Sequence, residues 1–123
     1  MKYSAIELAA VIKLGKAMTL ADGKEVEEED AIQVHETLSF GVDPDDLNKL
    51  FALADEMEPS IAIITVAMMD DERKKYVTGY LAAIMAVDGK IDESEMKLWR
   101  MISSLAALPV MSVQEAIEYW KNN

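Results

Sequence analysis

The 123-residue sequence contains no cysteine, and this absence removes several kinds of chemistry at once. Without thiols the chain can form no disulfide, no thiolate metal site and no cysteine nucleophile. It also lacks an uncharged apolar stretch of the roughly twenty residues that a membrane-spanning helix needs. A secretory signal is not indicated, because Glu7 and Lys13 interrupt the apolar pattern of the N-terminus. We therefore expect a cytoplasmic protein that does not insert into membranes.

Basic residues are also scarce, with 12 Lys and Arg against 23 Asp and Glu and a net charge of −11. This charge repels phosphate backbones and anionic lipids, so we expect neither as a binding partner. The acidity is uneven: residues 1–62 carry 14 acids and 5 bases, whereas residues 63–123 carry 9 acids and 7 bases. We expect protein partners, with the chain itself a monomer or a homodimer.

Apolar residues recur at helical spacing through most of the chain. The segment 61–69 is rich in β-branched residues that would suit a buried strand, but no partner strand is found, so a short helix is the better interpretation. The fold class predicted is all-α: one domain, residues 1–123, in a bundle of about seven helices. The expected helices cover residues 3–20, 27–40, 44–57, 59–69, 71–88, 92–106 and 112–121.

Several helix starts carry residues that can cap them. Asp43 precedes Pro44, which suits the first position of a helix. Asp92 is followed three residues later by Glu95, the spacing of a capping box with Asp in place of the usual Ser or Thr. Acids at these positions interact favourably with the positive end of the helix dipole, and each stabilises the helix by roughly 0.3–1 kcal/mol.

Two Asp-Gly junctions indicate an internal repeat. Ala21-Asp22-Gly23 and Val87-Asp88-Gly89 each follow a predicted helix and precede an acidic helix start, and the first has one inserted residue, Glu25. The repeat halves would cover residues 3–57 and 71–121, with the helix at 59–69 as the connector. We expect a pseudo-twofold bundle with both junctions near its axis.

The second junction matches the back half of an EF-hand calcium loop. Its front half fails, because Ile84 and Ala86 offer no side-chain oxygen at the first and third positions. A cation site must therefore be weak, shared between the junctions, or completed by ligands from other elements. An all-oxygen site favours Ca²⁺, Mg²⁺ or Mn²⁺. Capping alone would explain several of the same acids, so both interpretations stay open. The candidate metal ligands are Asp22, Glu27, Asp30, Asp88, Asp92 and Glu95.

These motifs resemble the tellurite-resistance TerB-like family. Its signature is a helix ending in Ala-Asp-Gly, followed by an apolar residue, an acid and Glu. Here the signature is met at 21–30 and again at 87–95, with Val87 in place of Ala. The resemblance implies an all-α fold with internal pseudo-symmetry and an acidic patch proposed to bind divalent cations. It also implies a link to tellurite and stress responses, often as a module that recruits other proteins.

Three functions are compatible with the sequence. The first is a non-enzymatic TerB-like module that binds a divalent cation or a basic partner through its Asp-Gly junctions. The second is a scaffolding protein that associates through an apolar face and binds no metal. The third and weakest is a carboxylate-based hydrolase, because an acidic cluster with no basic or aromatic clamp for a substrate is poor evidence for catalysis. One histidine and five scattered glycines also provide neither a catalytic triad nor a phosphate loop.

Overall fold

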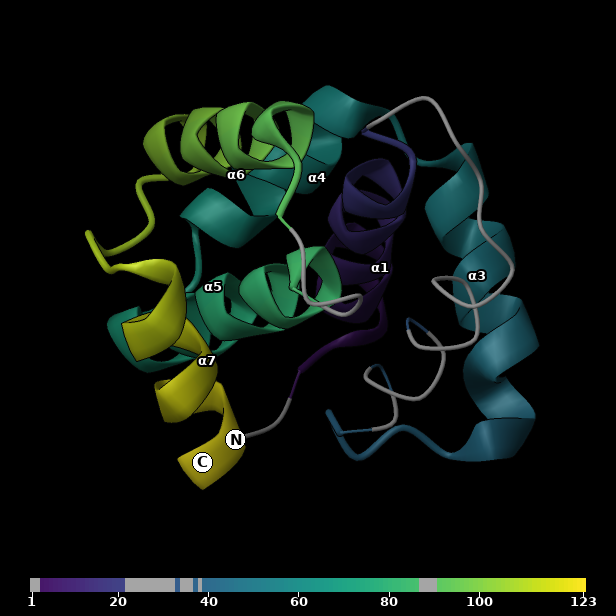
Figure 1. Ribbon diagram of the computed structural model, residues 1–123. Helices are drawn as coiled ribbons and strands as arrows, with labels where there is room; N and C mark the ends of the chain where they lie inside the picture. The colour runs from purple at the N-terminus through teal and green to yellow at the C-terminus, as the bar shows by residue number, and fades with distance from the viewer. Residues whose placement is uncertain (1–2, 22–32, 34–36, 38, 87–90) are drawn as a thin grey trace.

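Helices form all the regular secondary structure in the computed structural model, which describes residues 3–21, 33, 37, 39–86 and 91–123 (Figure 1). The all-α prediction is confirmed. The predicted helix at 27–40 lies mostly outside the described residues, of which Gln33 and Thr37 are helical. The elements are α1 (Ala5–Thr19), η1 (Pro44–Asp46), α3 (Leu47–Glu56), α4 (Pro59–Ala67), α5 (Asp71–Met85), α6 (Glu93–Leu105) and α7 (Val113–Asn122).

The expected helix at 59–69 is confirmed as α4, with Pro59 at its first position and Glu58 as its N-cap. The expected helix at 44–57 needs a correction, because it begins as a 3-10 turn. Asp43 caps this turn, and its Oδ1 accepts a hydrogen bond from the backbone N–H of Asp45 at 3.0 Å. The α-helical part, α3, starts only at Leu47.

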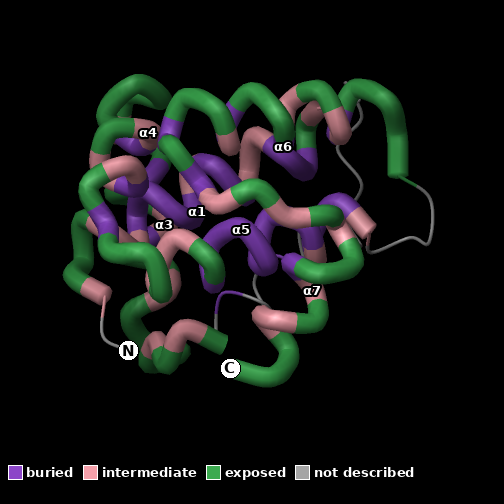
Figure 2. The backbone as a smooth tube through the Cα atoms, turned by 90° about the vertical axis from the view of Figure 1, so that its left-hand side faces the viewer, coloured by how far each residue is buried: buried purple, intermediate pink, exposed green. Residues whose placement is uncertain are grey.

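The α5 helix is the centre of the bundle. It contacts α1, α6 and α7, and Figure 2 shows most of its backbone as buried. From Tyr76 to Leu81 every residue is buried. A helical stretch buried on all sides must carry small or apolar residues all round, which explains why this part of α5 reads Tyr-Val-Thr-Gly-Tyr-Leu-Ala.

The α1 helix forms a second layer between α5 and the pair α3 and α4. Val11, Leu14 and Met18 pack into the main core with α5. Ala9 and Ile12 belong to a smaller apolar cluster that includes α3. None of the described helices is long and apolar enough to cross a bilayer.

A buried polar network links Gln33 and Thr37 to α1 and α5. Thr37 Oγ1 lies 3.0 Å from the hydroxyl of Tyr80, a residue with no exposed surface. Gln33 Nε2 donates to the backbone carbonyl of Ile12 at 3.0 Å and reaches the Tyr80 hydroxyl at 3.4 Å. Gly15 makes room for this network, because a Cβ there would lie 2.7 Å from the Tyr80 hydroxyl oxygen.

A cluster of aromatic rings around Phe40 lies next to this network and includes Tyr3 near the N-terminus. Phe40 packs edge to face against Tyr3, Tyr76 and Tyr80, with ring centroids 4.9–5.2 Å apart. The Tyr76 hydroxyl donates to the backbone carbonyl of Ser39 at 3.2 Å. Burial, and next the neighbouring Tyr76, raise the pKa of Tyr3 above its ordinary value. Ser39 and Phe40 are thus held against α5 by ring packing as well as by a hydrogen bond.

Replacement of Gly79 by Ala tests the close approach of α5 and α7. An added methyl group would collide with the Ala116 carbonyl oxygen and with Cβ of Trp120. We expect Gly79→Ala to lower the free energy of unfolding by about 1–3 kcal/mol, even though Ala is the better helix former. Urea denaturation followed by circular dichroism measures the change, and an unchanged or higher midpoint would contradict the close packing.

Removal of the Tyr80 hydroxyl tests the buried network. Tyr80→Phe leaves the Thr37 and Gln33 side chains short of a partner, so we expect a loss of about 1–3 kcal/mol in the free energy of unfolding. Tyr119→Phe is the matched control, since that ring lies on α7 and is only half-buried. We expect the control to change stability by less than about 0.5 kcal/mol. Equal effects of the two variants would show that the network contributes nothing.

Candidate functional site at the start of α6

The structure describes two of the six predicted metal ligands, Asp92 and Glu95. Both lie at the start of α6, as the capping spacing predicted. The other four, Asp22, Glu27, Asp30 and Asp88, lie outside the described residues.

Asp92 and Glu95 form a reciprocal capping box. Asp92 is the N-cap residue, with extended backbone angles, and its Oδ1 accepts a hydrogen bond from the backbone N–H of Ser94 at 3.1 Å. In return, Glu95 Oε1 accepts a hydrogen bond from the backbone N–H of Asp92 at 3.3 Å. The box satisfies amides that the first turn of a helix otherwise leaves unpaired.

Capping boxes also occur at two other helix starts. Ser4 with Glu7 caps α1, and Ser112 with Glu115 caps α7, with hydrogen bonds of 2.8–3.4 Å in both boxes. The spacing of an N-cap residue and a Glu three positions later is therefore part of how this chain starts its helices. Capping explains the hydrogen bonds that Asp92 and Glu95 accept from backbone amides of the first turn.

Burial distinguishes the box of α6 from the other two. Glu95 is only 7% exposed, whereas Glu7 is half-buried and Glu115 is exposed. Glu95 lies on the same face of α6 as the core residues Trp99 and Ile102. A buried carboxylate is costly unless hydrogen bonds and the helix dipole stabilise it. The start of α6 therefore combines a buried carboxylate with the exposed carboxylate of Asp92.

Two carboxylates are fewer than most metal sites use. Within residues 3–21, 33, 37, 39–86 and 91–123, no group of three or more His, Asp or Glu side chains is placed to hold an ion. A cation at this junction would need further oxygens from backbone carbonyls, from water or from the predicted ligands outside the described residues. Cation binding therefore remains a prediction.

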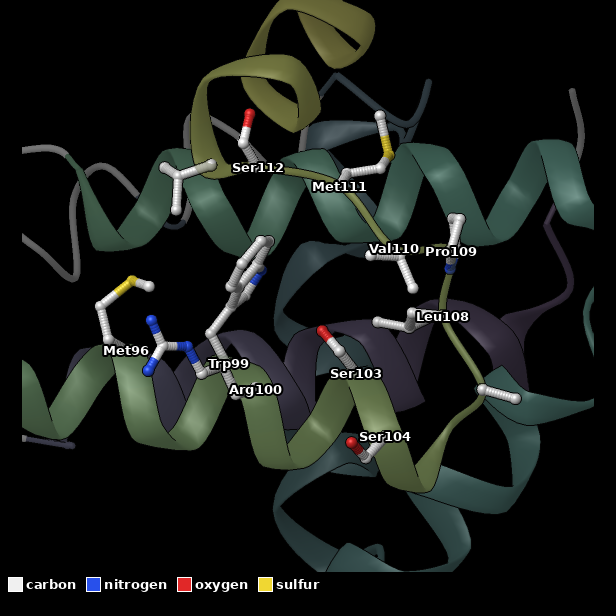
Figure 3. Close-up of a pocket in the computed structure, with 12 residues that line it drawn as sticks. Met96, Trp99, Arg100, Ser103, Ser104, Leu108, Pro109, Val110, Met111 and Ser112 are labelled. Atoms are coloured by element: carbon white, nitrogen blue, oxygen red, sulfur yellow. The ribbon is translucent and has the colours of Figure 1, made fainter.

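Sequence reasoning missed a groove beside α6. It has a volume of about 760 Å³ and lies between α6, the loop 107–112 and the start of α7 (Figure 3). Trp99 and Leu108 lie in it, and the Arg100 side chain lies at the end near Met96. The sequence feature that could have predicted this groove is the uncharged segment 101–114. An apolar loop between two helices leaves some of its apolar side chains at the surface.

A second groove, of about 510 Å³, lies between α1 and α3. Leu8, Val42 and Leu50 form its apolar part, and Asp43 and Asp46 lie at its edge. Neither Asp92 nor Glu95 lines either groove. Among the described residues, these carboxylates therefore share neither of the two grooves, and acid–base catalysis needs such a concave pocket.

Comparisons place the chain in an all-α, single-domain class of known structure. No family model and no curated protein matches it. It is similar to the crystal structure of PG1108, a protein of unknown function from Porphyromonas gingivalis W83, at 47% identity and a TM-score of 0.90. The match covers 99% of this chain and 92% of that one. The chain therefore belongs to the same family as PG1108.

Truncation of the buried Glu tests what the box of α6 contributes. Glu95→Ala leaves the Asp92 amide without its partner and a gap beside the core, so we expect a loss of about 1–2 kcal/mol in the free energy of unfolding. Glu115→Ala removes the same box residue from an exposed site, and we expect it to lower that free energy by less than about 1 kcal/mol. Equal losses, measured by chemical denaturation, would contradict a special role for the burial of Glu95.

Proposed function

We propose that this protein is a non-enzymatic, acidic helical binding module of the TerB-like type. Its Asp-Gly junctions would bind a divalent cation, Ca²⁺, Mg²⁺ or Mn²⁺, or a basic surface of a partner protein. The observation that carries the proposal is the pair of carboxylates at the start of α6, one buried and one exposed, directly after the second Asp-Gly. A link to tellurite or stress response rests on the resemblance of the motifs alone.

The proposed internal repeat would give the module a shared site. Asp43 and Ser112, the predicted equivalent helix starts, both act as N-caps. The second junction follows α5, and the first follows α1, which packs against α5. A pseudo-twofold arrangement of seven helices would place Asp22 and Asp88 together, where their mutual repulsion would favour a bound cation.

The non-enzymatic part of the proposal rests on how the described acids are used. Asp92 and Glu95 accept backbone hydrogen bonds and lie outside both grooves. A carboxylate-based hydrolase needs two such groups facing a substrate in a pocket. This alternative therefore has the least support among the three.

A scaffolding function is the second candidate, and a specific feature favours it. The outer face of α4, together with the C-cap residue Met68, exposes three large apolar side chains, Ile61, Ile64 and Met68. Clustered apolar side chains on a protein surface are typical of interaction sites. The chain would then associate with a protein through this face without a metal.

Calorimetric titration with Ca²⁺, Mg²⁺ and Mn²⁺ tests the first candidate. We expect saturable binding of at least one of these ions by the native chain. The double variant Asp22→Asn with Asp88→Asn removes two proposed ligands, and we expect it to weaken that binding by roughly tenfold or more.

The matched control is Asp45→Asn with Asp46→Asn, which removes two acids from the exposed turn η1. It changes the net charge by the same amount, so we expect less than about a twofold change in affinity. Absence of binding in the native chain, or an equal loss in both double variants, would show that the junctions form no cation site.

A further inference from the structure

The outer face of α4 is an apolar stripe without a partner in the described structure. Ile61, Ile64 and Met68 are 47%, 53% and 82% exposed. Their spacing of three and four residues places them on one face of the helix. Ala62 and Val66 occupy the opposite face and are fully buried against the core. Figure 2 shows exposed stretches of α4 at the outside of the bundle.

This stripe is unusual for a helix on the surface. Surface helices generally turn polar residues outward, and a helix that is apolar on all sides is generally buried. In α4 only Ser60 and Thr65 are polar, and Thr65 directs its hydroxyl to the backbone carbonyl of Ile61 at 2.7 Å. The composition of α4 is that of a buried helix, so its outer face fits a partner that covers it.

The charges around the stripe indicate what kind of partner would fit. Between Lys49 and Arg73 the chain has six acids and no base. These acids flank α4 at both ends and lie at 55, 56, 58, 70, 71 and 72.

Two of the flanking acids are already paired. Asp55 lies 3.6 Å from the ammonium group of Lys16, and Asp70 lies 3.4 Å from the guanidinium group of Arg73. The remaining four are exposed and form no ion pair with the residues that the structure describes. The apolar stripe therefore has unpaired negative charge at both ends, namely Glu56 and Glu58 at one and Asp71 and Glu72 at the other.

We propose that the outer face of α4 docks a basic amphipathic helix of a partner protein. The apolar residues of that helix would cover Ile61, Ile64 and Met68, and its Lys or Arg residues would face the acids at the two ends. This inference rests on the second candidate function and names both the surface and the chemistry of the partner.

The charge distribution favours such a helix over other occupants. A second copy of this chain also carries −11, and its α4 would bring acids against acids. An anionic membrane would be repelled by the same acids. A basic helix instead gains opposite charges at the rim, which guide association and orientation, and apolar contact at the centre.

The shape of the stripe sets the size of the contact. Residues 61 and 68 are seven positions apart, which spans about 10 Å along a helix axis. That length suits two turns of a partner helix, with apolar residues at i, i+3 or i+4, and i+7. Met68 has an unbranched, flexible side chain that can adapt to different partner residues. A contact of this size is expected to be weak and transient.

A designed peptide tests the inference on the full chain. The probe is a fluorescent Leu/Lys peptide of about 18 residues with Leu on one helical face. We expect fluorescence anisotropy to show saturable binding to the native chain. Ile64→Gln with Met68→Gln should weaken it roughly tenfold or more, and Glu58→Gln with Glu72→Gln should reduce both the affinity and its dependence on salt.

Two controls separate this face from general attraction to an acidic protein. Ile6→Gln alters an apolar side chain of similar exposure, 57%, on α1, and should change the affinity by less than about twofold. A peptide of the same composition without the apolar face should bind roughly tenfold more weakly. Equal binding of the two peptides, or no effect of the α4 variants, would overturn the inference.

The outcomes also separate this inference from the proposed function. Binding that survives the α4 variants but is lost in Asp22→Asn with Asp88→Asn would overturn docking on α4 and support the junctions as the basic-partner site. Cation binding without any peptide binding would also overturn docking on α4 and leave the cation module standing. Absence of both kinds of binding would contradict the inference and the proposed function together.

Discussion

The burial of α5 on every side between Tyr76 and Ala82 is the constraint on which the rest of the structure depends. Its central residue, Tyr80, has no exposed surface, yet its hydroxyl needs hydrogen-bond partners. Thr37 and Gln33 supply polar atoms, and Gly15 of α1 leaves the space. On the other side, Gly79 lets α7 approach the backbone of α5. The positions of α1, α7, Gln33 and Thr37 therefore follow from the need to cover one helix and to give its buried hydroxyl hydrogen-bond partners.

Local chemistry predicted the helix starts well, because capping depends on residues three apart in the chain. Asp92 with Glu95 and the start at Ser112 are where the sequence places them. The 3-10 turn at Pro44–Asp46 was not predicted, since proline and acids suit the first turn of either helix type. The burial of Glu95 and the exposure of α4 could not be predicted either. Both depend on which faces meet a neighbour, and the apolar pattern of α4 has no polar side to indicate it.

Acidic residues have different surroundings at the candidate site and at the α4 face. At the start of α6 the acids are first of all structural, because each box pairs amides that would otherwise lack partners. At the ends of α4 four acids have no such pairing among the described residues, and they border an apolar stripe. A net charge of −11 is thus distributed between helix capping, which stabilises the fold, and exposed carboxylates that are available to a cation or a basic partner.

The central claim is that the second Asp-Gly junction does more than cap a helix. Paramagnetic broadening of backbone amide signals by Mn²⁺ tests it directly, because the broadening falls steeply with distance from the ion. The boxes at Ser4–Glu7 and Ser112–Glu115 serve as internal controls with the same capping chemistry. We expect low concentrations of Mn²⁺ to broaden the amides of Asp92–Glu95 first and to leave both control boxes sharp. Equal broadening of all three boxes, or none at the start of α6, would show that its carboxylates are helix caps only.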